Sequence, residues 1–313
     1  MKHPPYHLRT NKAVDRFLLI EAIQSLGRPS ELAQYTYYGF GGPYLEDFRL
    51  LHESFPEMRM VSIERDAQTF KRQKFHLPCG QIRPEHVDFK SFLARYDSRD
   101  QKSIFWLDYT GLAYSQFEDF MSLLGKVAVG SIVKITLRAE PGDYLQQKRE
   151  DEFKAKFMAL LPSSDVALSR DSEKFAKLLQ DMLQIAAQQA LPSGMGIIYQ
   201  PISSFCYKDG DGIFTLTGIV CQRSELKGVR ALFSKWRFAN LNWARPKRID
   251  VPFLSTKERL HLQKHLPCGR DAGRRLLRVL RYNIDDDRRT AISKMKQYAD
   301  FYRYFPYFMK AVP

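Results

Sequence analysis

The feature that most constrains the fold is a run of four successive patterns within residues 34–64. Residues 34–38 (Gln-Tyr-Thr-Tyr-Tyr) form an apolar run typical of a buried strand, and Gly39-Phe-Gly-Gly-Pro43 then turns the backbone. Apolar residues follow at steps of three and four, the spacing of one helix face: Leu45, Phe48, Leu51 and Phe55. Residues 58–63 form a second apolar run, which ends at Glu64. This order predicts a β-α-β unit.

The β-α-β unit predicts a site for a ligand that carries a nucleoside. Gly39, Gly41 and Gly42 can adopt positive φ and let backbone N–H groups approach a ligand, although a plain tight turn would also explain them. Glu64 stands about twenty residues on, where a carboxylate accepts both ribose hydroxyls. The NAD pattern G-x-G-x-x-G fails because Tyr44 replaces its third glycine, and no P-loop Gly-Lys-Ser/Thr follows. S-adenosylmethionine, which has no pyrophosphate, fits this looser loop.

Two further strand ends carry polar side chains. Residues 84–89 predict a short third strand with Asp88 at its end, which would hydrogen-bond an adenine amino group or cap the helix that follows. Residues 103–107 are continuously apolar, as in a central parallel strand, and end in Asp108 and Tyr109. Because ligands bind beyond the carboxyl ends of such strands, Asp108 is expected to orient or deprotonate a nucleophile and Tyr109 to stack a base. The alternative is that Asp108 caps the next turn.

The end of this region distinguishes two sheet types. Residues 130–137 predict a fifth strand, and two β-rich runs at 196–206 and 213–221 flank Asp209-Gly-Asp-Gly212, which predicts a hairpin. Five β/α units closed by a hairpin give an α/β, Rossmann-like methyltransferase sheet, parallel with one antiparallel strand. Dehydrogenase sheets, by contrast, stay parallel.

The charge of the chain is concentrated near its C-terminus. Residues 224–313 contain 21 Lys and Arg and 8 Asp and Glu, so 13 of the 14 net positive charges lie there. Such asymmetry indicates a module that faces a polyanion, with nucleic acid as the first candidate and a solvated helical surface as the alternative. We therefore predict an N-terminal helical cover (1–29), a methyltransferase-like domain (30–223) and a small basic helical module (224–313).

Cellular context follows from simpler observations. No apolar run approaches the roughly 20 residues of a membrane span, and the N-terminus has no apolar core of a secretion signal. The four cysteines are scattered without paired C-x-x-C spacing: Cys79, Cys206, Cys221 and Cys268. This pattern is typical of reduced thiols in a cytoplasmic protein, and no metal site is expected.

Together these residues resemble a class I S-adenosylmethionine-dependent methyltransferase over roughly residues 30–222. The resemblance implies that S-adenosylmethionine is the cofactor, that its ribose binds Glu64 and its adenine side Asp88, and that Asp108 faces the methyl group. Two features depart from the family. Tyr37 and Tyr38 replace the usual acid before the first glycine, and Asp-Tyr-Thr-Gly111 is not the Asp/Asn-Pro-Pro-Tyr/Phe motif of amino-methylating DNA enzymes.

The opening Leu8-Arg-Thr-Asn-Lys-Ala-Val-Asp-Arg16 resembles a bacterial group called putative O-methyltransferases. Some members carry a C-terminal winged-helix module and occur near mobile-element or defence genes.

The basic module has its own pattern. Residues 245–248 (Arg-Pro-Lys-Arg) are interpreted as a linker, and Ser255-Thr-Lys-Glu258 is a capping box that opens a helix. Residues 270–282 predict a second helix and residues 285–304 a third, which together fit a winged-helix or helix-turn-helix unit. Five arginines follow steps of three and four, so most share a face that could track phosphates: Arg270, Arg274, Arg275, Arg278 and Arg281.

Two functions remain open from the sequence. The first is a methyltransferase that acts on, or is recruited to, nucleic acid through residues 224–313. The second is a weak or inactive methyltransferase-like nucleotide sensor, with a tail that binds nucleic acid or a protein partner, within a defence system. The sequence names neither the acceptor atom nor the oligomeric state, and no membrane partner is expected.

Overall fold

The computed structural model describes residues 9–97, 101–163 and 166–305. The chain separates into two compact units. The core unit comprises residues 19–206 and 211–247, and the C-terminal unit comprises residues 1–18, 207–210 and 248–313. Whether the ranges 1–29, 30–223 and 224–313 fold as independent domains stays a prediction.

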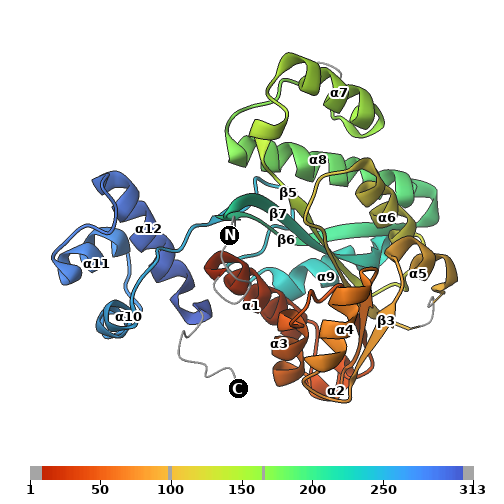
Figure 1. The fold of residues 1–313 in the computed structure, drawn as a ribbon, viewed down its shortest axis with the longest axis horizontal. Helices are drawn as coiled ribbons and strands as arrows, with labels where there is room; N and C mark the ends of the chain where they lie inside the picture. Colours follow the sequence, from red (N-terminus) through yellow and green to blue (C-terminus); the bar gives the residue numbers. More distant parts are fainter. Residues whose placement is uncertain (1–8, 98–100, 164–165, 306–313) are drawn as a thin grey trace. The chain divides into compact units, whose positions relative to one another are not determined.

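The described strands form one eight-stranded sheet with the order β3-β2-β1-β4-β5-β7-β6-β8 (Figure 1). They are β1 (Thr36–Gly39), β2 (Arg59–Glu64), β3 (Ile82–His86), β4 (Ser103–Asp108), β5 (Ile132–Arg138), β6 (Ile197–Asp209), β7 (Asp211–Gln222) and β8 (Lys247–Ile249). Strands β1 to β5 pair in parallel, whereas β7 runs antiparallel to β5. The predicted fold class is therefore confirmed.

The described helices occupy the connections between strands and the end of the chain. They are α1 (Thr10–Gln24), α2 (Pro29–Leu32), α3 (Glu46–Ser54), α4 (Ala67–Phe75), α5 (Phe89–Arg95), α6 (Tyr114–Leu124), α7 (Gln147–Phe157), α8 (Ser172–Ala190), α9 (Leu226–Phe233), α10 (Thr256–Gln263), α11 (Ala272–Leu280) and α12 (Arg288–Phe301).

Helices cover both faces of the sheet in the core unit (Figure 1). Neighbouring side chains of a strand point to opposite faces. Tyr37 packs edge-on against Phe48 of α3, with ring centroids 4.9 Å apart, whereas Tyr38 stacks on Phe105 of β4 at 4.5 Å and lies 5.6 Å from Phe92 of α5. Helices α3 and α5 thus lie on opposite faces, and the main apolar core lies on the face of α5, α6 and α8.

The tip of the hairpin formed by β6 and β7 also anchors the N-terminus of α1. Within the C-terminal unit, the Asp209 carboxylate at the hairpin tip accepts hydrogen bonds from the backbone N–H of Asn11 (3.2 Å) and of Lys12 (2.8 Å). The Asn11 amide donates to Asp209 Oδ1 at 2.9 Å as well. An acid from the distant hairpin therefore caps the N-terminus of α1, satisfying helix N–H groups that have no partner within the helix.

The segment interpreted as a linker is in part a strand, and this interpretation was wrong. Residues Lys247–Ile249 form β8 at the edge of the sheet beside β6. Ile249 is buried whereas Arg248 is exposed, the alternation expected of a strand with one covered face. Basic residues are common on edge strands because they discourage pairing with other chains, so the charge pattern did not indicate a loop.

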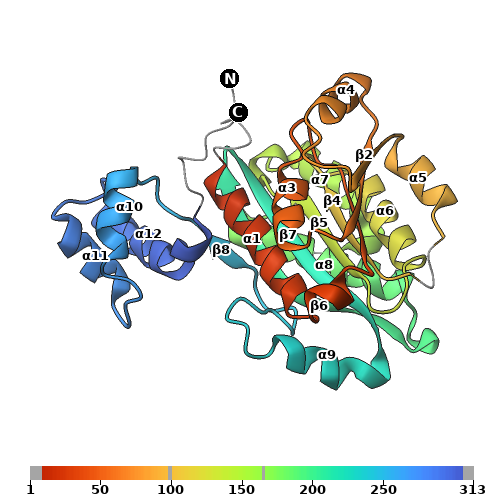
Figure 2. The ribbon, with the colours of Figure 1, turned by 90° about the horizontal axis from the view of Figure 1, so that it is seen from below.

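Helices α10, α11 and α12 lie together in the C-terminal unit (Figures 1 and 2). The predicted capping box of Ser255 and Glu258 opens α10, and Asp287 caps α12 by accepting from the Thr290 N–H at 2.8 Å. Gly273 lets α11 approach α12, because a Cβ there would lie 2.2 Å from the Ile292 carbonyl oxygen. The three predicted helices are confirmed. Since residues 250–305 contain no strand, the winged-helix form is not.

Candidate active site

The carboxyl ends of four parallel strands bring the predicted cofactor residues together. Strands β3, β2, β1 and β4 are consecutive neighbours, and Gly39 pairs in register with Ser62 of β2 and Trp106 of β4. The carboxyl ends of these strands therefore carry the glycine loop (residues 39–42), Glu64, the turn to Asp88, and Asp108. In open α/β sheets ligands bind beyond these ends. We call this set the strand-tip site.

The glycines of the loop have different roles. Gly41 has φ +69°, and a Cβ there would lie 2.6 Å from Leu45 Cδ2, so packing and backbone conformation both require glycine. Gly42 has φ +54°, and a Cβ there would meet no atom within 4 Å. Its open side leaves room for a ligand to approach the backbone. Gly39 is the last residue of β1, and a Cβ there would lie 2.7 Å from the Tyr37 hydroxyl oxygen.

Gln73 of α4 fixes the glycine loop, a role that the sequence analysis missed. Its fully buried amide donates to the carbonyl oxygens of Phe40 (2.8 Å) and Gly42 (3.0 Å). Its Oε1 accepts from the Ser62 hydroxyl of β2 at 2.8 Å. Both polar atoms of this side chain thus hold the loop against β2. No local signal marked this role, because α4 is a polar helix in which Gln73 is the buried residue.

A carboxylate lies beside the loop although the usual acid before the first glycine is missing. Asp47, in the first turn of α3, accepts a hydrogen bond of 2.5 Å from the Tyr37 hydroxyl. Tyr37 occupies one of the two positions where the resemblance placed an acid. Its phenol reaches across the loop and joins an acid from the next helix.

Glu64 ends β2 with its carboxylate half-buried. Its Oε1 accepts from the backbone N–H of Asp66 at 2.8 Å, and burial raises the pKa of the carboxyl above its usual value of 4.5. The Asp66 hydrogen bond favours the charged form and opposes this shift. One oxygen is therefore engaged with the turn that follows the strand.

Asp88 caps helix α5, as one of its two interpretations predicted. Its Oδ1 accepts from the Ser91 N–H at 2.9 Å, and the hydrogen bonds from Ser91 lower the pKa of Asp88. Its role toward adenine stays a prediction. The cap also fixes where Phe89, the first residue of α5, begins to cover the sheet.

Tyr109 donates a hydrogen bond to Asp119 of α6, with 2.6 Å between the oxygens. Its ring lies edge-on to Phe40 of the glycine loop, with centroids 5.3 Å apart, and Phe40 lies 5.7 Å from Phe89. Burial, and then the Asp119 charge, raise the pKa of Tyr109 far above its usual value, while burial raises that of Asp119. The phenol therefore stays protonated. Base stacking by Tyr109 stays a prediction.

Asp108 is the last residue of β4 and is half-buried. Its register partner is Thr136 of β5, and the turn after it is held by a hydrogen bond of 3.0 Å from the Arg138 N–H to the Gly111 carbonyl. These contacts fix the Asp108 backbone at the carboxyl end of β4. Its catalytic role stays a prediction.

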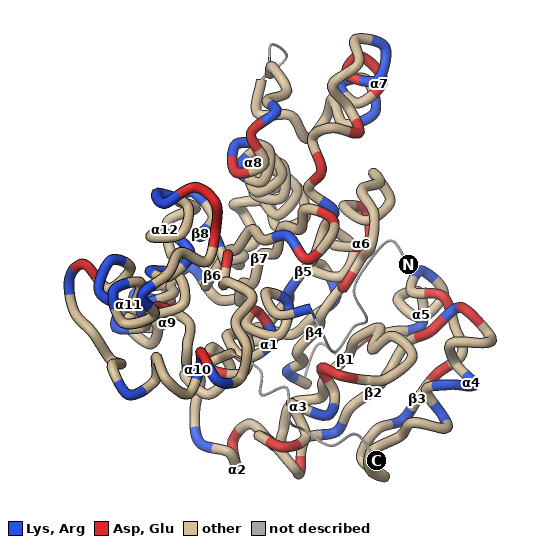
Figure 3. The backbone as a smooth tube through the Cα atoms, turned by 60° about the vertical axis from the view of Figure 1, so that its left-hand side comes forward, with Lys and Arg blue, Asp and Glu red and all other residues tan. Residues whose placement is uncertain are grey.

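The five predicted arginines are divided between a helix and its ends. Arg274, Arg275 and Arg278 are exposed on α11, Arg270 precedes the helix, and Arg281 follows it with φ +67°. Figure 3 shows basic residues concentrated along α11. Leu276, Leu277 and Leu280 form its buried side.

Within the described residues, no helix is long and apolar enough to cross a membrane. The same part of the chain holds no group of three or more His, Cys, Asp and Glu residues that could bind a metal ion. All four cysteines are free thiols.

Comparison with solved structures finds distant likenesses. Trm1 from Pyrococcus horikoshii, solved with S-adenosyl-L-methionine, is 12% identical, with a TM-score of 0.48 over 70% of this chain and 58% of Trm1. The plantazolicin methyltransferase BpumL with SAH is 10% identical, with a TM-score of 0.40 over 66% and 84% of the two chains. A Methanococcus jannaschii fibrillarin, a pre-rRNA processing protein, is 10% identical, with a TM-score of 0.36 over 59% and 66%. This chain thus spans about 58% of the length of Trm1. We draw no conclusion about substrate from these likenesses.

The family match is far more extensive. The model of a family described as "Putative O-methyltransferase" matches residues 4–313, almost the whole chain, whereas no curated protein matches. The match confirms the resemblance to the putative O-methyltransferase group, though not the prediction of a winged-helix module. The chain belongs to the Putative O-methyltransferase family.

Proposed function

We propose that this protein transfers a methyl group from S-adenosylmethionine to a nucleic acid. The observation that carries the proposal is the pairing of the strand-tip site with a strongly basic C-terminal region in one chain of a methyltransferase family. The first feature suits the cofactor and the second suits a polyanionic substrate. We also propose that the protein is cytoplasmic.

The donor set of the strand-tip site fits S-adenosylmethionine. The open side of Gly42 leaves room for the cofactor against the loop backbone. Glu64 keeps Oε2 to accept from ribose hydroxyls while Oε1 holds the Asp66 N–H. Asp47 supplies a carboxylate for the methionine ammonium, in place of the acid that Tyr37 and Tyr38 displace. Asp88 remains the candidate for the adenine amino group.

When bound, the cofactor supplies an electrophilic methyl group on a sulfonium sulfur. The acceptor atom would take this methyl group with S-adenosylhomocysteine as the leaving group, and the acceptor would lose a proton. Asp108 is the carboxylate placed to orient the acceptor and take that proton. The remaining catalysis comes from alignment of the acceptor and exclusion of water. Because burial keeps Tyr109 protonated, its ring lines the site and its hydroxyl does not act as a base.

Nucleic acid is favoured as the acceptor because of where the charge lies. The last 90 residues carry 13 of the 14 net positive charges, and cationic surfaces of this kind bind phosphate backbones with release of counterions. Nothing comparable would be needed for a small uncharged acceptor. A protein partner that carries a polyanionic surface is the competing explanation.

The test is transfer of label from methyl-tritiated S-adenosylmethionine to purified RNA, single-stranded DNA and duplex DNA, with the Asp108→Asn variant as control. We expect one nucleic acid to gain label with the wild type and none with the variant. Tight cofactor binding in calorimetry without transfer to any of the three would contradict the proposal. That outcome would favour the nucleotide-sensor function.

A further inference from the structure

A pocket of about 640 Å³ opens between α11 and α12 of the C-terminal unit. Four arginines line it: Arg274, Arg278, Arg281 and Arg288. The first three belong to the predicted set, and Arg288, the first residue of α12, is new. Arg270 and Arg275 do not line it. The structure therefore divides the predicted arginines by position and adds one from another helix.

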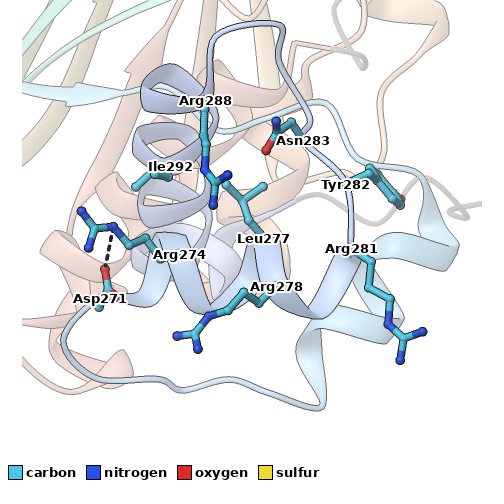
Figure 4. Close-up of a pocket in the computed structure, with 9 residues that line it drawn as sticks. All are labelled: Asp271, Arg274, Leu277, Arg278, Arg281, Tyr282, Asn283, Arg288 and Ile292. Atoms are coloured by element: carbon cyan, nitrogen blue, oxygen red, sulfur yellow. Dashed lines mark ion pairs between the residues drawn. The ribbon is translucent and has the colours of Figure 1, made fainter.

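The guanidinium groups are spread around the pocket rather than aimed at one point (Figure 4). Arg274 points toward Asp271, with which it forms an ion pair of 3.7 Å, and this acid also lines the pocket. Arg278 and Arg281 point outward along α11 in different directions. A single small anion would be held best by converging donors. Cations spread over a rim suit a ligand that carries several phosphates in a row.

The floor of the pocket is apolar, and its side offers an amide. Leu277 of α11 and Ile292 of α12 line it, and Leu277 is 8% exposed. Asn283 and Tyr282 line the side between the helices, and the Tyr282 hydroxyl is fixed by a 2.5 Å hydrogen bond to Glu258. An inorganic phosphate would make no use of such a floor. A nucleobase would, because its faces are apolar and its edge carries donors and acceptors that an Asn side chain matches.

We propose that this pocket holds one unpaired nucleotide of a single-stranded nucleic acid. The base lies on Leu277 and Ile292 with its edge toward Asn283, and the flanking phosphates lie against Arg278, Arg281 and Arg288. A pocket of this volume falls in the range for ligands of nucleotide size. The inference rests on the proposed function, for which it names the partner as a single strand and the C-terminal unit as its binding site.

The first experiment measures binding of a labelled single-stranded RNA 12-mer to the full-length protein by fluorescence anisotropy over a salt series. It compares the double variant Arg278→Glu/Arg288→Glu with the double variant Arg275→Glu/Arg289→Glu. Both pairs change the net charge by the same amount on the same two helices, and all four side chains are exposed. Only the first pair lines the pocket.

We expect the pocket pair to weaken binding at least 30-fold and the control pair to weaken it less than 5-fold. The slope of log affinity against log salt should become shallower by about 1.4 in the pocket pair, because each single-strand phosphate that an arginine neutralises adds about 0.7. Equal weakening by the two pairs would mean that diffuse charge, not the pocket, binds the strand. That result would overturn the proposal.

The second experiment isolates the base. It compares the 12-mer with an abasic oligonucleotide of the same length, for the wild type and for Asn283→Ala. We expect the wild type to bind the abasic strand at least 10-fold more weakly, consistent with the cost of removing a bound base, and the variant to lose part of that preference. Equal binding of both strands by the wild type would overturn the placement of a base in the pocket.

The outcomes separate this inference from the proposed function. Label transfer to RNA that the pocket pair leaves unchanged, with strand binding also unchanged, would reject the pocket and keep the function. Pocket-dependent strand binding without label transfer to any nucleic acid would keep the pocket and reject the function. Calorimetry with S-adenosylmethionine checks that the core unit of both double variants is folded, because the strand-tip site contains none of the four arginines, and melting curves check the C-terminal unit.

Discussion

The strand-tip site and the arginine pocket differ in how their polar groups are held. At the strand tips, the Gln73 amide makes three hydrogen bonds while fully buried, and Asp88 and Asp119 are also engaged. In the pocket, the arginines are exposed, and the Arg274 side chain is 69% exposed although it pairs with Asp271. One region is assembled before its ligand arrives. The other offers long, movable side chains.

This difference suits the two ligands that we propose. A small cofactor must be held in one orientation for methyl transfer. Rigid donors help because the conformational entropy of their side chains has already been lost during folding. A nucleic acid strand presents phosphates at variable positions, which flexible arginines can follow. Substitutions in the first region should therefore change chemistry, stability or cofactor affinity, whereas those in the pocket should change strand binding alone.

The largest effect should come from Asp108→Asn. We expect the transfer rate to fall about 10²- to 10⁴-fold because a positioned proton acceptor is lost. Affinity for S-adenosylmethionine should stay within about 2-fold, since Glu64 and the glycine loop are intact. Single-turnover rates and calorimetry measure the two quantities. Loss of cofactor binding would show that Asp108 holds the cofactor rather than the acceptor.

Gln73→Leu should loosen the glycine loop of the strand-tip site. The change leaves the Gly42 carbonyl without its side-chain donor. The Phe40 carbonyl keeps the Gly42 N–H at 2.8 Å, and the Ser62 hydroxyl keeps only its 3.4 Å hydrogen bond to Phe40. We expect the free energy of unfolding to fall by about 2–4 kcal/mol, since one unsatisfied buried group costs about 1–3 kcal/mol and each of the other two lost hydrogen bonds about 1 kcal/mol. Cofactor affinity should fall as well.

The matched control for Gln73→Leu is Arg288→Leu, a polar-to-apolar change in the pocket. Because Arg288 is exposed, we expect a change within about 0.5 kcal/mol and unchanged cofactor binding. Denaturant unfolding curves measure both variants. Equal losses of stability would remove the distinction between a preassembled site and a flexible pocket.

Glu64→Ala should weaken S-adenosylmethionine binding by about 1.5–3 kcal/mol, the range for hydrogen bonds to a charged group. Strand binding through the pocket should not change. Calorimetry of the folded variant measures the first effect and anisotropy the second. Unchanged cofactor affinity would place the ribose elsewhere along the sheet edge.

The smallest effect concerns Asp119. Burial raises the pKa of its carboxyl above the usual 3.8, so folding favours the protonated form. Its contribution to stability is therefore complete below pH 3.8 and declines as the pH rises through the folded-state pKa. Asp119→Asn lacks this decline and can still accept from Tyr109. We expect the variant to exceed the wild type by under about 1 kcal/mol at pH 7, because Asp119 is partly exposed.

That difference in stability should vanish below pH 3.8, as melting curves at about pH 3.5 and pH 7 would show. A variant that is less stable than the wild type at pH 7 would mean that the charged carboxylate, bonded to Tyr109, outweighs the cost of its burial.

Local rules predicted much of the fold. Gly41 marks the turn because positive φ and close packing both require glycine, and Ser255 and Asp287 mark helix starts through their own side chains. The hairpin and the strand that ends at Glu64 follow from period and composition. The resemblance to a family then connected these elements to a cofactor.

Residues whose role depends on distant partners could not be predicted. Gln73 acts on Phe40, 33 positions away, and no local pattern names that partner. Arg288 faces the pocket because Gly273 lets α12 approach α11, a consequence of packing rather than of the arginine's own helix. Ile249 belongs to a strand because residues 247–249 pair beside β6, which is distant in the sequence.

The cap that Asp209 provides for α1 has a consequence for the order of synthesis. Asn11 and Lys12 leave the ribosome before their partner Asp209, which follows 198 and 197 positions later. At about 5–20 residues per second, that separation corresponds to roughly 10–40 seconds of translation. During this interval the N-terminus of α1 lacks its cap. The start of α1 is therefore capped only after the hairpin has been made, and chaperones that bind nascent chains would encounter α1 without its cap.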